Sequence, residues 1–195
     1  MSTNNLIENV SGFVIPFLTE NLSANLHFHT IDHTLDVVQA AEEIGIQSRL
    51  SEEEMTVLRV AAWFHDCGYA HTYSGHEEES KKIAVNFLNN TGCQQDFIEA
   101  VLSCIESTKY PQNPSSLVEK VLCDADFYHF TKPCYPRYEQ AIRQEFETFF
   151  GLVYTDEEWC IKNCSFLIQH QYYTDYGKQV LSRFKEVNIQ LLQPK

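Results

Sequence analysis

The feature that most constrains the fold is an apolar helical run that ends in two polar, titratable side chains. Residues 57–64 are almost entirely apolar, and His65, Asp66 and Gly68 follow directly. Burying a histidine and a carboxylate at the inner end of such a helix costs free energy unless a partner compensates them. A divalent metal ion is one such partner, because imidazole and carboxylate together suit manganese, iron, cobalt, nickel or zinc. The dipeptide alone is a weak signal, so the rest of the chain has to support it.

Apolar residues recur at helical spacing along the whole chain. A capping box at residues 51–54 precedes the run described above, and a second box at residues 155–158 precedes a later helix. No segment shows the two-residue alternation of a half-buried strand. The sequence therefore predicts a single-domain, all-α bundle of about eight helices over residues 1–195. The predicted helices cover residues 4–22 (bent or split near Pro16), 31–44 (ended by Gly45), 51–66, 77–90, 97–105, 117–127, 137–150, 155–171 and 174–192.

The charge balance limits the partners that such a bundle can bind. Asp and Glu number 27 against 14 Lys and Arg, which gives a net charge of −13. This charge repels nucleic acid polymers and anionic membranes, so neither is expected as a partner. A small phosphorylated substrate stays compatible with the charge if a metal ion and a few local cations override it.

The cysteines and the first apolar stretch predict the compartment. Seven cysteines are scattered without a CxxC pair, and Cys160 and Cys164 share one helix face without a second pair nearby. We interpret the cysteines as buried, reduced thiols rather than a zinc site. The apolar stretch at residues 13–18 is too short for a signal peptide or a membrane span and is broken by Pro16. These features favour a reducing, cytoplasmic location.

Four polar residues lie where a helical bundle should be apolar. His33 begins the second predicted helix, His65 and Asp66 end the third, and Asp124 lies within a later apolar run. In helical bundles, metal ligands project inward from facing helices. Two imidazoles and two carboxylates would form a mixed nitrogen and oxygen site with room for water. We interpret Asp126 as a helix cap or an outer partner of this site, because it lies two residues after Asp124 and such positions on a helix point in different directions.

These residues carry a resemblance to a known family. In their order, and on separate helices, they resemble the HD-domain superfamily of metal-dependent phosphohydrolases, in particular its bacterial predicted phosphohydrolases. The resemblance extends from about residue 26 to residue 185. The stretches that carry it are an aromatic-His-x-x-x-His-Thr motif within residues 28–38, the His-Asp motif within 61–69, His76-Glu77-x-x-Ser80, residues 122–126, and Tyr138, Ile142-Arg143 and Glu145-Phe146.

The resemblance implies one divalent metal ion held by His33, His65, Asp66 and Asp124. The ion, which could be manganese, iron, cobalt, nickel, zinc or magnesium, would polarise a phosphoryl oxygen and lower the pKa of a bound water. Asp66 would also orient that water. His29, one helical turn before His33, is similar to a histidine that protonates the leaving oxygen in the cyclic-nucleotide phosphodiesterase branch. The alternative for His29 is a capping or packing role at the helix start.

The function that the resemblance implies is hydrolysis of a small phosphoester, with nucleotides among the candidates. His76, Lys109 and Arg143 are candidate substrate contacts, and solvated surface charge is the alternative for the two cations. Binuclear members of the superfamily imply a second ion near His71 or His76 as another alternative. Some relatives are di-iron oxygenases or nitrile-hydrating enzymes, and others are regulatory modules with a structural metal ion. The sequence leaves these alternatives open. It also leaves open whether the substrate is a phosphomonoester or a cyclic diester, and whether the protein forms a homodimer.

Overall fold

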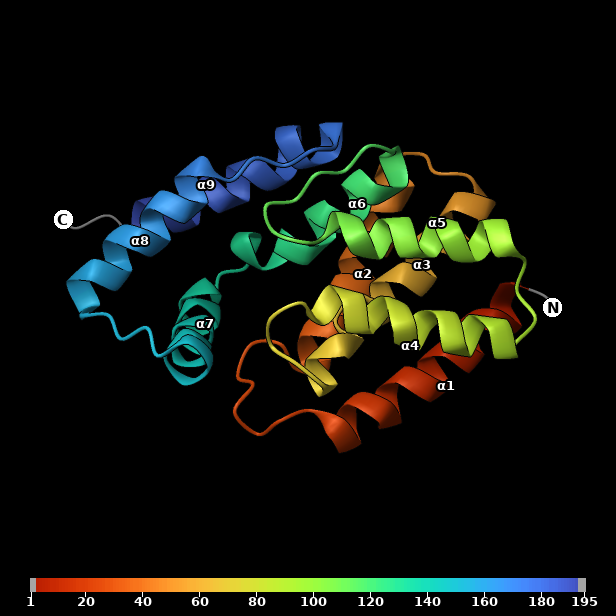
Figure 1. The fold of residues 1–195 in the computed structure, drawn as a ribbon. Helices are drawn as coiled ribbons and strands as arrows, with labels where there is room; N and C mark the ends of the chain where they lie inside the picture. The colour runs from red at the N-terminus through yellow and green to blue at the C-terminus, as the bar shows by residue number, and fades with distance from the viewer. Residues whose placement is uncertain (1–2, 193–195) are drawn as a thin grey trace.

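The computed structural model describes residues 3–192, and the regular structure in that range is helical throughout (Figure 1). Nine α-helices within this range confirm the predicted all-α fold. Between residues 3 and 192, no helix combines the length and the hydropathy that crossing a membrane requires. The elements are α1 (Thr3–Asn21), α2 (Ile31–Gln47), α3 (Glu52–Phe64), η1 (Cys67–Ala70), α4 (His76–Asn90), α5 (Gln95–Ser107), α6 (Leu117–Asp126), η2 (Phe127–Thr131), α7 (Tyr135–Phe150), α8 (Asp156–Gln169), η3 (Gly177–Leu181) and α9 (Ser182–Leu192).

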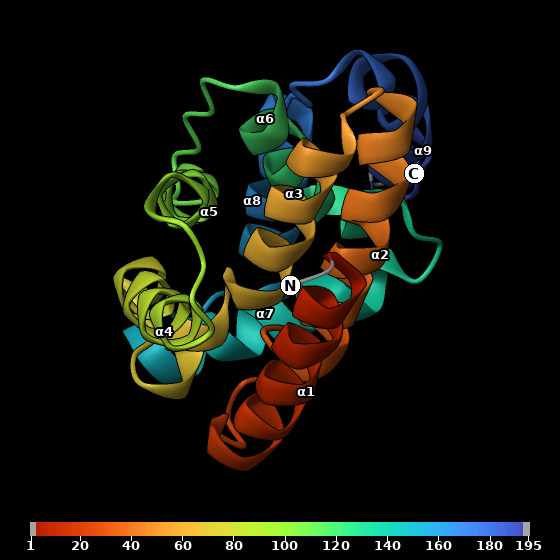
Figure 2. The ribbon, with the colours of Figure 1, turned by 90° about the vertical axis from the view of Figure 1, so that its right-hand side faces the viewer.

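α3 lies at the centre of the bundle, and its sequence explains why. The predicted capping box closes its first turn: the Ser51 hydroxyl accepts the Glu54 N–H, and the Glu54 carboxylate accepts the Ser51 N–H at 2.8 Å. Residues 60–64 are buried on every side. A helix that is apolar all round has to be covered by other elements, and α1, α2, α4, α5 and α6 pack against it (Figure 2). The chain therefore leaves α3 with His65 and Asp66 inside the protein.

Gly45 and Pro16, predicted to end α2 and to bend or split α1, do not interrupt these helices. Gly45 does not end α2, which continues to Gln47. A Cβ at Gly45 would lie 2.6 Å from Met55 Sδ, so this glycine allows α2 and α3 to pack closely. Pro16 lies inside α1, which runs as one helix without a split.

α7, α8 and α9 lie to one side of the bundle formed by α1 to α6 (Figure 1). α8 begins at the predicted capping box, where the Thr155 hydroxyl accepts the Glu158 N–H at 3.2 Å. A second, smaller apolar cluster joins these helices to η2, which follows α6 directly; its buried members are Phe130, Tyr135, Leu167 and Ile189. The three last helices are thereby attached to the bundle at the end of α6.

Candidate metal centre

Three of the predicted ligands converge on one point inside the bundle. His33 lies in the first turn of α2, and His65 and Asp66 directly follow α3. One ligand atom from each of these side chains lies within 4.8 Å of the other two, and all three residues are buried. Among the described residues, His33 Nε2, His65 Nε2 and Asp66 Oδ2 have no hydrogen-bond partner. Buried polar atoms without partners are rare, and this mixed nitrogen and oxygen set fits a divalent metal ion.

The backbone of α3 orients the ring of His65. His65 Nδ1 lies 2.8 Å from the carbonyl oxygen of Ala62, one turn earlier in the same helix. Because a carbonyl only accepts, Nδ1 carries the proton and Nε2 presents its lone pair to the cluster. Metal-binding histidines are commonly fixed in this way through their other ring nitrogen.

Gly68 allows the chain to turn tightly after the His-Asp pair. A Cβ at this position would lie 1.8 Å from the carbonyl oxygen of His76. The Gly68 N–H donates to the Ser80 hydroxyl at 2.7 Å. The start of α4 is thus held against the turn that follows α3, which places His76 Nε2 3.4 Å from Asp66 Oδ1.

The fourth side chain at the cluster is Asp126 rather than Asp124, so the prediction of Asp124 as a ligand is wrong. Asp126 Oδ1 lies 3.3 Å from His33 Nε2 and 3.9 Å from His65 Nε2. Asp126 is the last residue of α6, and η2 begins at the next position. Helical spacing correctly separates the directions of the two carboxylates, but it does not show which of them faces α2 and α3. That choice depends on how α6 is rotated in the bundle.

Asp124 instead anchors the last helical stretch of the chain. Its Oδ1 accepts the Tyr173 N–H at 2.7 Å, and its Oδ2 accepts the N–H and the hydroxyl of Thr174 at 2.9 and 2.7 Å. A Cβ at Gly177 would lie 2.4 Å from Asp124 Oδ2, so only glycine permits this approach. Burial raises the pKa of Asp124, and the three hydrogen bonds oppose this rise.

The imidazoles and carboxylates of the cluster shift one another's pKa values. Burial disfavours the charged form of His33, but Asp126 and Asp66 outweigh it and raise the pKa of His33 to about 10. Burial also disfavours the ionised form of Asp66, but the nearby imidazoles of His65, His33 and His76 outweigh it and hold the pKa of Asp66 well below its usual range. A divalent cation would compete with protons for the same nitrogen and oxygen atoms.

Two further predicted histidines lie beside the cluster, on either side of Tyr69. The Tyr69 ring stacks on His76 with centroids 3.8 Å apart and on His29 with centroids 4.1 Å apart. The centroid of His29 is 5.8 Å from that of His33. The structure therefore brings both His29 and His76 next to the ligand cluster. Tyr69, to which sequence reasoning assigned no role, lies between the two rings and contacts both.

A buried glutamate of α7 holds His29 in place. Glu145 Oε1 accepts the three backbone N–H groups of residues 27–29 at 2.6 to 3.0 Å. Glu145 Oε2 lies 2.5 Å from His29 Nδ1 and accepts the Tyr73 hydroxyl at 3.1 Å. Burial raises the pKa of Glu145, but these interactions outweigh it and lower the pKa below its usual value. Sequence reasoning assigned Glu145 no role, because its partners lie 72 to 118 positions away.

The two predicted cationic substrate contacts are not brought to the cluster. Arg143 donates to Asp156 Oδ1 at 2.8 Å and to the carbonyl oxygen of Tyr154, so its guanidinium ties α7 to the start of α8. Lys109 is exposed just beyond the end of α5, where its charge acts on Glu78 of α4. Lys109 is therefore a surface charge, which was its alternative interpretation, whereas Arg143 is half-buried and joins two helices.

Of the two histidines considered for a second ion, only His76 lies at the cluster. His71 is exposed, and its ring centroid is 6.2 Å from that of Phe17 in α1. His76 is half-buried, and its Nε2 faces the oxygen of Asp66 that points away from His33.

Comparisons with known proteins agree with this arrangement. No curated protein matches the chain at a significant level. Among solved structures, the fold is similar to that of a predicted HD superfamily hydrolase from an uncultured Thermotogales bacterium, with a TM-score of 0.57 and 23% sequence identity over 87% of this chain and 94% of that chain. A family model described as HD domain matches residues 30–131, which is just over half of the chain and includes every residue of the cluster. The chain therefore belongs to the HD-domain family.

Proposed function

We propose that this protein is a metal-dependent phosphohydrolase that acts on a small phosphoester. Membership of the HD-domain family supports a metal-dependent hydrolase. The observation that carries the proposal is the meeting of His33, His65, Asp66 and Asp126 inside the bundle, with buried ligand atoms that lack partners among the described residues. These four residues would hold one divalent ion. When bound, such an ion would supply Lewis-acid activation of the phosphoryl group and of the attacking water.

Asp66 has a geometry suited to two tasks. Its Oδ2 lies 3.3 Å from Nε2 of both His33 and His65, and its Oδ1 lies 3.4 Å from His76 Nε2. One oxygen can therefore face the ion while the other accepts a hydrogen bond from the attacking water. His76 would hold the second oxygen in position and contact the substrate.

His29 is the proposed general acid, and Glu145 is its positioning residue. A carboxylate at Nδ1 holds the proton on that nitrogen, so the other ring nitrogen is the one that exchanges a proton with its surroundings. The other ring nitrogen is then free to deliver a proton to the leaving oxygen. Because Glu145 also binds the backbone of residues 27–29, it fixes the ring and its loop together.

Metal loading and a substrate panel test the hydrolase proposal. The full-length protein is stripped with a chelator, reloaded with each candidate ion and assayed on monoesters and cyclic diesters. We expect one tightly bound ion per chain and turnover of a small phosphoester, both lost in His65→Ala and in Asp66→Ala. His71→Ala, which removes an exposed histidine, should retain both. Unchanged hydrolysis by a metal-free His65→Ala/Asp66→Ala variant would contradict the proposal, as would a metal-loaded wild type that is inactive on the whole panel.

The leaving group tests the proposed roles of His29 and Glu145. In Glu145→Gln, the amide oxygen can still accept the backbone N–H groups, but the amide nitrogen cannot accept from His29 Nδ1. We expect kcat to fall about 100-fold for alkyl esters, which need a proton on the leaving oxygen. Esters of 4-nitrophenol, which leave without a proton, should lose little. Glu147→Gln, at an exposed position of the same helix, is the control, and equal losses on both ester types would show that Glu145 has only a structural role.

The position of His76 favours a second candidate function. Because Asp66 presents one oxygen to His33 and His65 and the other to His76, it could bridge two ions. Two irons at these positions would support the oxygenase alternative. Two irons per chain and an oxygen-dependent product would favour this second candidate, whereas one ion per chain and turnover without oxygen would exclude it.

A further inference from the structure

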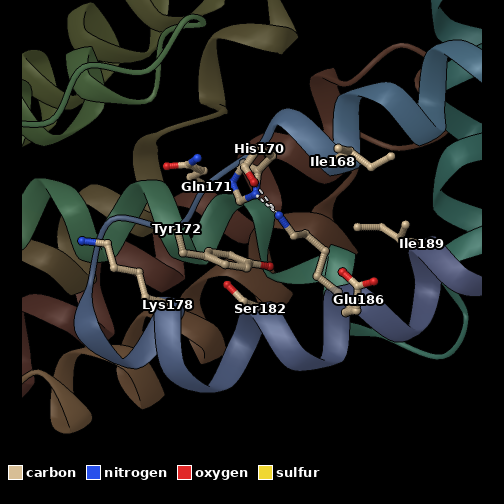
Figure 3. A pocket seen from close by; sticks show the side chains of 9 residues that line it. Ile168, His170, Gln171, Tyr172, Lys178, Ser182, Glu186 and Ile189 are labelled. Carbon is tan, nitrogen blue, oxygen red and sulfur yellow. Dashed lines mark hydrogen bonds between the residues drawn. The ribbon is translucent and has the colours of Figure 1, made fainter.

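A groove lies between the end of α8 and the last helical stretch of the chain (Figure 3). Its volume is about 570 Å³, and the buried ring of Tyr172 lies on its floor. The rings of Phe127 and Phe130 contact His170 on the groove side, with centroids 4.9 and 5.1 Å away, and His129 on the other side. This aromatic layer separates the groove from the metal centre.

The groove contains a buried ammonium group. Lys185 of α9 is only 7% exposed. Its Nζ donates to the carbonyl oxygen of His170, lies 3.5 Å from His170 Nδ1 and is 5.6 Å from the centroid of Tyr172. Among the described residues no carboxylate forms an ion pair with it, and Glu186, which also lines the groove, acts on it only through its charge. The end of α8 offers only about half a unit of negative charge in compensation.

Two hydrogen-bond donors at this position lack acceptors. An ammonium group has three N–H bonds, and the two contacts with His170 leave one unused. Burial and the charge of Lys185 lower the pKa of His170 to about 3, so its ring is neutral. Because Nδ1 faces the ammonium and accepts from it, the ring proton is on Nε2, which has no partner in the part of the chain that the structure describes. Unused buried donors of this kind are costly unless an acceptor reaches them.

The local charge of the groove is opposite to that of the whole molecule. Lys178 and Lys185 line it against the single acidic side chain Glu186, whereas the chain has a net charge of −13. Lys178 lies at the end of the groove beyond Tyr172, and Ser182 lies beside the Tyr172 ring (Figure 3). A ligand that accepts from both lysines would therefore carry negative charge on oxygen.

We propose that this groove binds a small phosphate oxyanion, free or as the end group of a small metabolite, between Lys185 and Lys178. The unused N–H bond of Lys185 selects an acceptor, and Lys178 adds charge at the rim. The site is independent of the proposed hydrolase activity, because no residue of the metal centre lines it.

Calorimetric titration of the chelated, full-length protein with inorganic phosphate tests this site, since no ion is then available at the metal centre. We expect saturable binding that Lys185→Met weakens about tenfold or more, the loss of one charge-assisted hydrogen bond. Lys178→Met should weaken it several-fold, and Glu186→Gln should tighten it. A second titration uses glycerol 3-phosphate. Tighter binding of glycerol 3-phosphate than of inorganic phosphate would indicate a phosphorylated metabolite as the ligand, and weaker binding would indicate free phosphate.

Lys162→Met is the matched control, because Lys162 is an exposed lysine of α8 outside the groove. It removes the same charge and should leave phosphate binding unchanged. Lys178 and Glu186 are exposed, so their variants test the site even if Lys185→Met fails to fold. The proposal is overturned if phosphate shows no saturable binding at millimolar concentration, or if Lys162→Met weakens binding as much as Lys178→Met.

Discussion

Asp124 and Asp126 show how the direction of one side chain decides its role. Both are carboxylates of α6, and both are surrounded by apolar neighbours in the sequence. Asp124 is satisfied by three hydrogen bonds from residues 173 and 174, and Asp126 faces the imidazoles of His33 and His65. One residue therefore holds the framework, and the other is available to a cation.

Substitution of these two residues should separate metal binding from stability. Asp126→Asn should lower the affinity for a divalent ion by more than about 100-fold, because changes to outer partners of a ligand already cost about 10- to 100-fold. Asp124→Asn should retain ion binding but lower the free energy of unfolding by about 2 kcal/mol, because an amide cannot accept all three hydrogen bonds. Chelator competition and urea unfolding measure the two effects. The reverse pattern would restore Asp124 as the ligand.

Gly68 should tolerate no side chain. In Gly68→Ala, the methyl group would overlap the carbonyl oxygen of His76, so we expect a loss of about 3 kcal/mol or more and a displaced α4. Gly12→Ala is the control, because Gly12 is an exposed position in α1 with nothing near its Cβ. It should stabilise the protein by up to about 1 kcal/mol through helix propensity. Urea unfolding of the two variants measures both changes, and similar stabilities would show that the turn after α3 can adjust.

The capping residues at the helix N-termini of this protein differ in burial and in whether they also contact a neighbouring helix. α3, α6 and α8 each begin with a capping box. The box of α3 is exposed, whereas Glu119 of α6 also accepts the Ser103 hydroxyl of α5 at 2.8 Å and the Ser115 N–H at 2.6 Å. The cap of α6 therefore joins two helices, and α6 carries Asp126 into the metal centre.

Removing the two caps should have unequal effects. Glu119→Ala should lower the free energy of unfolding by about 2 kcal/mol, because it removes a cap and also the hydrogen bond that joins α6 to Ser103 of α5. Glu54→Ala should cost less, since water replaces the exposed carboxylate. Thermal or urea unfolding measures the difference, and equal losses would indicate that the contact between α5 and α6 adds nothing.

At the scale of the whole molecule, the burial of a neutral histidine beside the ligand cluster should make the fold acid-sensitive: the ring centroid of His129 lies 6.4 Å from that of His33. Burial, together with the charge of His33, lowers the pKa of His129 from 6.5 to about 3. Below about pH 6.5 His129 binds a proton in the unfolded chain but stays neutral in the folded protein. The stability that neutral His129 contributes is therefore present above pH 6.5 and is lost as the pH falls towards 3.

Replacement of this histidine should flatten the pH dependence. In His129→Phe, the loss of unfolding free energy between pH 7 and pH 5 should be smaller than in the wild type by about 2 kcal/mol. Urea unfolding in the presence of a chelator measures this loss at both pH values. His71→Phe, at an exposed position, should follow the wild type. An unchanged pH dependence in His129→Phe would mean that His129 is accessible to protons in the folded state.

The sequence by itself determined the helices, two of the capping boxes, the central place of α3 and the family. These properties follow from local chemistry: apolar periodicity sets helix faces, and an apolar run such as residues 60–64 has to be interior. For the same reason the sequence named His33, His65 and Asp66, because polar groups at the ends of buried helices need a partner.

Only the tertiary structure decided which neighbours those helices present to one another. It chose Asp126 over Asp124, used Gly45 for packing rather than for termination, and brought Glu145 of α7 to His29 across more than a hundred positions. The physical reason is that periodicity fixes the direction of a side chain relative to its own helix axis. The rotation and distance of the next helix come from packing the whole core, and no local pattern contains them.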